Sequence, residues 1–270
     1  MGKQYRIWLL VALVALPSVL AQSPEKQYGF AEELRGDGDE ILALLEYRRF
    51  AYLYPKHEKA PEALLQAAMI RLRHTREVSK AERTLGRIAE GYPDSKVAER
   101  AAELKKFAAV NSDYQGDPLA LYLQALQETG RGNHARALEL FGSIVEKWKD
   151  AQLADDAMLE AAKVHLQQTN EPKKAREKLD ALLETYPKRS TVPEATYRRA
   201  EAVLKIQGAG TEAMNAFRSV TEKFPKSAYA QEARKRIDEL EKQRSFVKRT
   251  YDKSLVRDYE SLLEEQPANP

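Results

Sequence analysis

Residue types that could carry catalysis or bind a metal are few in this chain of 270 residues. It holds four histidines, and no two of them have the spacing of a metal-binding pair: His57, His74, His134 and His165. The dipeptide at 57–58 begins like a zinc-protease helix, but proline occupies position 61, where the second histidine ligand would stand. Cysteine is absent, which excludes thiolate nucleophiles, cysteine-ligated zinc and iron–sulfur clusters. We therefore expect no catalytic residue, no metal, no cofactor and no enzymatic activity.

Other patterns of known chemistry are also missing. Asp37, Asp39 and Glu40 lie close together in the sequence, but the full loop of oxygen ligands that calcium requires is absent. No nucleophile elbow, phosphate-binding loop or dinucleotide fingerprint occurs. Lysine and arginine number 44 against 41 aspartates and glutamates, a balance that gives no electrostatic footprint for nucleic acid. These patterns give no indication of an enzymatic or nucleic-acid-binding function.

The first residues have the layout of a secretory signal peptide. Lys3 and Arg6 precede an uncharged apolar run over residues 7–21, which is shorter than the roughly 20 residues needed to span a bilayer. Small residues stand at the third and first positions before Gln22, as a cleavage site requires. We expect residues 1–21 to be a cleaved signal peptide, with an uncleaved anchor as the alternative. The mature chain should be exported, with no transmembrane span and, without a cysteine to carry lipid, no lipid anchor.

An aromatic residue recurs along the rest of the chain, followed by proline at four of its five sites: Tyr54, Tyr92, Trp148, Tyr186 and Phe224. The aromatic residues are separated by 38, 56, 38 and 38 residues, and the degenerate site is Trp148-Lys149. Eleven residues before each aromatic residue stands an alanine: Ala43, Ala81, Ala137, Ala175 and Ala213. Regular spacing of this kind predicts an internal repeat.

Further positions repeat in register with this alanine. Large residues stand four residues after it (Tyr47, Leu85, Phe141, Leu179 and Phe217) and seven after it (Phe50, Ile88, Ile144, Leu182 and Val220). Offsets of 0, 4, 7 and 11 share one face of an α-helix, which the proline then ends. Five residues before each alanine stand the residues expected in a tight, left-handed turn: Gly38, Arg76, Gly132, Asn170 and Gly208. Each unit is therefore predicted to be helix, turn, helix and proline.

This pattern resembles the tetratricopeptide (TPR) repeat. The alanine-to-proline spacing of twelve and the two large apolar positions match that repeat, although the period is 38 rather than 34. The longer variety is similar to the repeats of exported bacterial envelope proteins such as the Tol-Pal-associated protein CpoB (YbgF) and the assembly lipoprotein BamD. The resemblance covers roughly residues 28–240. It implies an all-α, TPR-like α-solenoid of about five helix-turn-helix repeats, with an extra helix and a carboxy-terminal capping helix.

The 56-residue spacing leaves room for the extra helix, which is expected over residues 95–110 and is followed by a polar break at 111–116. We therefore expect TPR-like repeats with an extra helix over residues 22–112 and further repeats over 117–244, with one continuous superhelix as the alternative. Helix starts are expected at Asp117-Pro118 and near Thr191, whose hydroxyl could form a capping box with Glu194.

The carboxy-terminal stretch 245–270 is expected to hold a helix extension and a tail. Phe246, Tyr251, Leu255, Tyr259 and Leu262 have the spacing of one helical face. The favoured interpretation is a cap that folds back on the repeats; the alternative is a projecting helix that docks a partner.

The TPR resemblance also implies a binding surface, because the first helix of each pair lines the concave wall of such arrays. Mapped onto this chain, the wall includes nine residues: Gln66, Ile70, Arg73, Glu160, Val164, Gln167, Arg198, Ala202 and Lys205. Arg198, Arg199 and Lys205 could attract an acidic segment, with a solvated basic face as the simpler interpretation.

Three functions compete. The favoured one is an exported, non-catalytic scaffold or adaptor that binds protein partners in the bacterial cell envelope, in the periplasm of a Gram-negative bacterium and peripheral to the outer membrane. The second is a structural subunit of a large envelope assembly for secretion, pilus formation or outer-membrane barrel assembly. The third is a cell-wall glycan enzyme, which would need paired carboxylates in a pocket.

Overall fold

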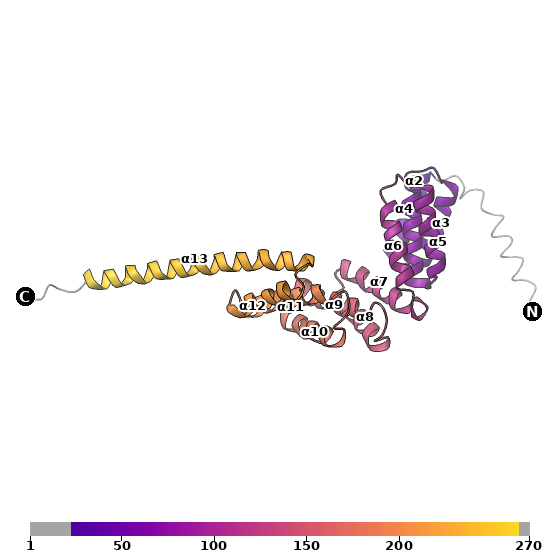
Figure 1. Ribbon diagram of the computed structural model, residues 1–270. Helices are drawn as coiled ribbons and strands as arrows, with labels where there is room; N and C mark the ends of the chain where they lie inside the picture. The colour runs from indigo at the N-terminus through magenta and orange to yellow at the C-terminus, as the bar shows by residue number, and fades with distance from the viewer. Residues whose placement is uncertain (1–22, 265–270) are drawn as a thin grey trace, which may run out of the picture. The chain divides into compact units, whose positions relative to one another are not determined.

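The computed structural model describes residues 23–264, and over that range the chain is built from helices without any strand. The expected signal peptide, residues 1–21, lies outside the described residues. The chain divides into two compact units, Met1–Gln124 and Ala125–Pro270, and each is described separately below (Figure 1). The prediction of an all-α fold of helix-turn-helix repeats is confirmed.

The first unit contains two helix pairs and an extra helix. The pairs are α2 (Pro24–Asp37) with α3 (Glu40–Leu53), and α4 (Ala60–Ile70), extended by the π-helical turn η2 (Arg71–Thr75), with α5 (Val78–Gly91). The extra helix α6 (Ala98–Val110) packs against α5, as expected from the 56-residue spacing. A short 3-10 turn, η3 (Tyr114–Gly116), leads into α7 (Asp117–Gly130), within which the boundary between the units falls.

The second unit continues the alternation of paired helices. It contains α8 (His134–Lys147), α9 (Ala154–Lys163) with the π-helical turn η4 (Val164–Gln168), α10 (Pro172–Thr185), α11 (Val192–Gln207), α12 (Thr211–Lys223) and α13 (Ala228–Glu264). From α8 to α13, each α-helix packs against the next one along the chain. This is the packing expected of a solenoid, in which each repeat mainly contacts its neighbours.

The repeat positions form the core. All five repeat alanines are 0% exposed, and the ten larger residues four and seven positions later are no more than 1% exposed. A residue as small as alanine lets the neighbouring helix approach closely, and the larger side chains fill the space that remains. The apolar pattern of the sequence therefore identified the buried face of every second helix.

The aromatic residue before proline has a role of its own. The Tyr92 hydroxyl donates to the carbonyl of Pro55 at 2.9 Å, and the Tyr186 hydroxyl donates to the carbonyl of Lys149 at 2.7 Å. Both acceptors stand 37 residues earlier, at the corresponding turn of the preceding repeat. These bonds tie successive turns together, which explains why tyrosine stands at positions 92 and 186.

The turns inside the repeats have positive φ at all five expected positions, although Gly208, with ψ of −167°, lies outside the left-handed helical region. Gly38, Gly132 and Gly208 have φ of 90°, 82° and 74°, and Arg76 and Asn170 have φ of 55° and 51°. Residues with a Cβ are strained in this region, whereas glycine enters it freely.

Gly132→Ala is expected to lower the free energy of unfolding by about 1 kcal/mol, because alanine resists the positive φ. No atom lies within 4 Å of where its Cβ would stand, so steric overlap adds nothing. Gly142 in α8 is the matched control: its site is equally open and its φ is not positive. Gly142→Ala should stabilise by about 0.5–1 kcal/mol, since alanine favours helix. Urea unfolding measures both, and a shift of the same sign for the two variants would contradict the assigned turn.

Two expectations about helix ends need correction. Thr191 precedes α11, but its side chain makes no capping bond; its hydroxyl donates to Asp155 Oδ2 at 2.8 Å instead, so the predicted capping box with Glu194 is wrong. The fold-back of the carboxy-terminal segment is also wrong, because α13 is one continuous helix that extends past α11 and α12 (Figure 1).

Helix α13 changes character along its length. Ala230, Ala233 and Leu240 are buried, and the last two belong with Phe217 of α12 to one core cluster. Farther along the helix, the hydrophobic side chains are exposed to solvent: Phe246, Val247 and Tyr251 are 69%, 59% and 63% exposed. The first part of α13 therefore caps the repeats, and the later part presents apolar side chains to solvent.

Candidate functional site

The three predicted wall residues of the first unit lie on α4 and η2. Ile70 is fully buried, so it offers no surface to a ligand. Gln66 is half-buried and its amide donates to Glu62 Oε1 at 2.8 Å. Arg73 is 7% exposed and its Nη2 donates to Glu40 Oε2 at 3.5 Å. Of these three, Gln66 alone presents appreciable surface.

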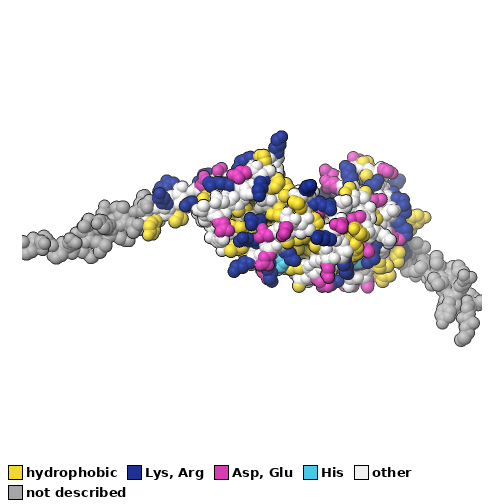
Figure 2. All heavy atoms as spheres, turned by 60° about the horizontal axis from the view of Figure 1, so that its bottom comes forward, with side chains coloured by type: hydrophobic (Ala, Val, Ile, Leu, Met, Phe, Trp, Pro, Cys, Tyr) yellow, Lys and Arg dark blue, Asp and Glu magenta, His cyan; other side chains and the backbone are white. Residues whose placement is uncertain are grey.

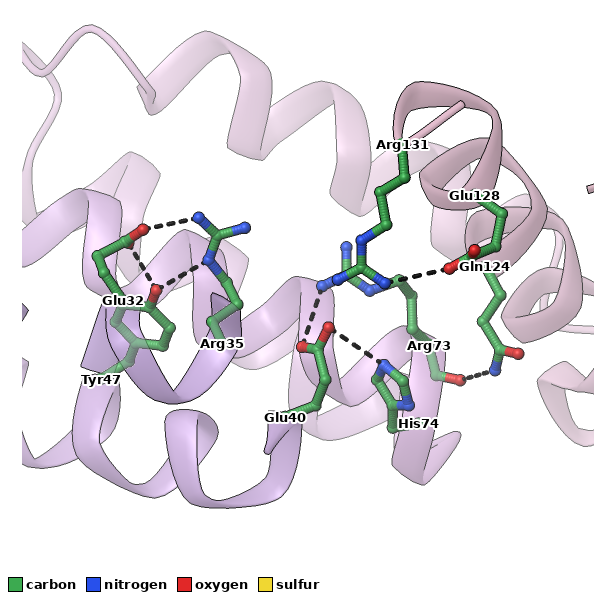
Figure 3. Close-up of polar contacts among 9 residues, drawn as sticks. All are labelled: Glu32, Arg35, Glu40, Tyr47, Arg73, His74, Gln124, Glu128 and Arg131. Carbon is green, nitrogen blue, oxygen red and sulfur yellow. Dashed lines mark hydrogen bonds and ion pairs between the residues drawn. The ribbon is translucent and has the colours of Figure 1, made fainter. Parts of the chain in front are cut away.

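Arg73 belongs to a buried polar network that joins the first two repeats (Figure 3). Glu40, the first residue of α3, is 7% exposed and accepts from Arg73; His74 Nε2 lies 3.7 Å from its other carboxylate oxygen. The Gln124 amide donates to the Arg73 carbonyl oxygen at 2.5 Å. A buried ion pair of this kind contributes mainly to structure, because its groups are withdrawn from solvent.

A second polar cluster lies between α2 and α3 (Figure 3). The Tyr47 hydroxyl donates to Glu32 Oε1 at 2.6 Å, while Arg35 donates to Tyr47 at 3.2 Å and to Glu32 Oε2 at 2.7 Å. Burial alone would raise the pKa of Glu32, but the hydrogen bonds from Tyr47 and Arg35 outweigh it and hold that pKa below its ordinary value. The carboxylate is therefore satisfied within the chain and is no candidate for general acid catalysis.

The six predicted wall residues of the second unit lie on α9, η4 and α11. Val164 is 2% exposed and Ala202 is 0% exposed, so neither offers surface. Glu160 and Arg198 are half-buried, and Gln167 and Lys205 are exposed. These residues lie on the first helices of their repeats, and the face that they share carries both core and surface positions.

The cations in this region are already bonded to groups of the chain. Arg198 pairs with Glu194 at 3.2 Å and with Glu201 at 2.8 Å. Arg199 pairs with Asp180, and Lys205 Nζ donates to the carbonyl of Leu166 at 2.7 Å. These three cations therefore have bonds within the chain that an acidic segment would have to share or replace, and its binding there stays a prediction.

Carboxylates gather near the start of α9. Asp155 is 1% exposed, accepts from Thr191 and lies 3.8 Å from Arg189 Nε. Next to it, burial and then repulsion by Asp155 and Glu160 raise the pKa of Asp156 from 3.8 to about 6. Sequence reasoning missed this pair, because its bonds run between repeats and have no fixed sequence spacing.

Asp156→Asn is expected to stabilise the chain by about 1 kcal/mol near pH 7 and to have little effect near pH 4. The raised folded pKa means that protonated Asp156 contributes stability below pH 3.8, and that this contribution is lost as pH rises through about 6. Urea unfolding across this range measures the difference between variant and parent. The exposed Asp94→Asn is the control; an equal pH dependence of both variants would contradict the assignment.

Metal and membrane features can be stated for the described residues. Between residues 23 and 264, no three histidine, aspartate or glutamate side chains are grouped so that they could hold a metal ion. Within the same range, no helix has both the length and the apolar character needed to cross a bilayer.

Comparison with known proteins identifies the repeats. Residues 62–95 match a tetratricopeptide repeat family, and residues 114–245 match a family described as YfiO, outer membrane lipoprotein. The chain therefore contains TPR-like repeats and, over 114–245, is similar to an outer membrane lipoprotein family. The YfiO match begins just before α7 and ends within α13, so it covers the repeats of the second unit.

Two further comparisons carry less information about this chain. A thermophilic TPR protein of Thermus thermophilus is 19% identical; the match covers 81% of this chain and 98% of that one, with a TM-score of 0.36. No curated protein matches significantly.

Proposed function

We propose that this TPR protein is an exported, non-catalytic scaffold or adaptor that binds protein partners in the cell envelope of a Gram-negative bacterium. The observation that carries the proposal is the match of residues 114–245 to an outer membrane lipoprotein family, on helices that form TPR-like repeats. Arrays of paired helices bind peptides and helices on preformed surfaces without covalent chemistry. The periplasm is the proposed location, with peripheral association with the outer membrane.

The proposed contact residues are the predicted wall residues that reach the surface. They are Gln66 in the first unit and Glu160, Gln167, Arg198 and Lys205 in the second. The buried members of the set, Ile70, Arg73, Val164 and Ala202, would support these side chains from within. Figure 2 shows positive and negative side chains interspersed on the face that it displays, which suits recognition by local pattern rather than by net charge.

A second candidate is a fixed subunit of a large envelope assembly. The exposed apolar side chains of α13, namely Phe246, Val247 and Tyr251, favour it. Exposed apolar surface of this kind is typical of a contact that is permanently covered in a complex.

Cell fractionation tests the location, and size-exclusion chromatography of the native extract tests the role. We expect a carboxy-terminally tagged chain to be recovered from the periplasmic or outer-membrane fraction, beginning at Gln22. Recovery from the cytoplasm with the amino terminus intact would contradict export. A free monomer with transient partners fits the adaptor, whereas a stable large complex favours the second candidate.

A further inference from the structure

A groove on the first unit is lined by arginines and lacks acidic residues. It lies among α3, α4, η2 and α5 and has a volume of about 390 Å³. We call it the arginine groove, and its lining residues are Leu45, Arg48, Arg49, Ala51, Tyr52, Leu64, Arg71, Thr84 and Arg87. Four arginines and no carboxylate in the lining make the groove positively charged, although Arg49 and Arg71 have ion-pair partners outside the lining, Glu46 and Glu77.

Arg71 forms the buried part of the arginine groove. Arg71 is 8% exposed, and its Nη1 donates to Thr84 Oγ1 at 3.0 Å. Its Nε has no hydrogen-bond partner among the described residues, and Glu77 Oε2 lies 3.5 Å away, in an ion pair that Glu77 shares with Lys80. Burial, and then repulsion by Arg48, lowers the pKa of Arg71. A carboxylate entering the groove would therefore relieve a desolvated charge.

The rim combines free cations with apolar side chains. Arg48 and Arg87 form no ion pair within residues 23–264, whereas Arg49 lies 3.7 Å from Glu46. Leu45 and Tyr52 are 50% and 83% exposed. Guanidinium groups beside open leucine and tyrosine side chains are the composition of a protein-binding surface.

The repeat itself does not require these arginines. Arg49 and Arg87 stand six residues after their repeat alanines, where the other repeats have Ser143, Ala181 and Ser219. Since three other repeats hold small neutral side chains at this position, the repeat packing does not require an arginine there.

The position of Arg71 differs among the repeats. In η4 it is His165, which is 7% exposed and lies 2.9 Å from Glu171, as Arg71 lies near Glu77. The corresponding residue of α11 is Val203, which is buried at 2% exposure. An apolar side chain therefore suits this position in another repeat, and Arg71 carries a desolvation cost that packing does not demand.

We propose that the arginine groove binds an acidic segment of a partner protein, in which carboxylates alternate with large apolar side chains. This names the partner class for the adaptor role proposed above and rests on it. The carboxylates would pair with Arg48, Arg71 and Arg87, and the apolar side chains would cover Leu45 and Tyr52. A protein side chain can reach the recessed Arg71, whereas a flat bilayer surface would meet the rim alone, which favours a protein over anionic lipid.

Peptide binding tests this proposal on the purified chain beginning at Gln22. The probe is a fluorescent peptide of repeated Glu-Leu-Glu-Glu-Leu, and its control has glutamine in place of glutamate. We expect the glutamate peptide alone to bind, with an affinity that falls as salt rises. Arg48→Glu with Arg87→Glu should weaken binding by about tenfold or more.

The matched control reverses the charge of two lysines on α10 in the second unit, Lys173→Glu with Lys178→Glu. It should leave peptide binding nearly unchanged. Equal weakening by both pairs, or equal binding of both peptides, would overturn the proposal. Binding to phosphatidylglycerol vesicles that depends on Arg48 and Arg87, without peptide binding, would overturn it in favour of a membrane surface. Peptide binding is independent of cellular location, so cytoplasmic recovery with intact peptide binding would refute export and leave the groove standing.

Discussion

Phe217→Ala is expected to lower the free energy of unfolding by about 3–5 kcal/mol, the range for removing a fully buried aromatic ring. Phe217 is 0% exposed and lies four residues after the repeat alanine of α12. Its ring packs 5.6 Å from that of Tyr197 on α11, so the substitution leaves a cavity between the two helices of one repeat. Urea unfolding followed by circular dichroism measures the loss.

Phe246→Ala is the matched control for this substitution. The same residue type stands on α13 with 69% of its surface exposed, so its removal should change the free energy of unfolding by less than about 0.5 kcal/mol. A large loss at position 246 together with a small loss at 217 would contradict both the repeat core and the open end of α13.

Glu40→Gln should lower the free energy of unfolding by about 3–5 kcal/mol, because it removes the carboxylate that pairs with the buried Arg73 charge at 3.5 Å. The two side chains are each 8% exposed, and they join α3 to η2. Replacing both residues by apolar ones, as in Glu40→Leu with Arg73→Met, should recover most of the loss, since no charge then remains buried. Denaturant unfolding of the single and double variants measures this coupling.

An exposed ion pair provides the comparison. Arg218 and Glu241 lie 3.1 Å apart with side chains 46% and 51% exposed, and Glu241→Gln should cost less than about 1 kcal/mol. Equal costs at positions 40 and 241 would show that burial does not set the strength of the first pair.

Much of the fold could be predicted because the repeat encodes it locally. Alanine, a large residue four positions later and another seven positions later define a helical face, and the structure buries that face in all five repeats. The turn conformation of Arg76 and Asn170 was harder to predict, because neither residue is glycine. Both stand at the repeat position that holds Gly38, Gly132 and Gly208, and both have the expected positive φ.

One error concerns a contact between repeats. Thr191 has the sequence signature of a cap, but its hydroxyl binds Asp155 of the preceding repeat. Nor did the sequence show that Arg198 and Lys205 also bind groups on their own or a neighbouring helix. Periodicity reports which face of a helix is apolar; it does not report which side chain lies opposite.

The candidate site was predicted less well than the fold for the same reason. Mapping from the TPR pattern selects helix positions, but Ile70, Val164 and Ala202 point into the packing and are buried. The arginine groove was missed, although a signal was available: Arg49 and Arg87 occupy one repeat position that elsewhere holds serine or alanine. A charge at a position that the fold leaves unconstrained is a useful sign of binding.

The most direct test of a protein-binding role is site-specific photo-crosslinking in the native cells. A photoreactive phenylalanine analogue replaces Tyr52, which lines the arginine groove and is 83% exposed, or Lys178 on α10 as the control. We predict one discrete protein adduct at position 52, mapped by mass spectrometry to a segment rich in aspartate and glutamate, and none at 178. The absence of an adduct at position 52, or the same adducts at both positions, would contradict the proposed role.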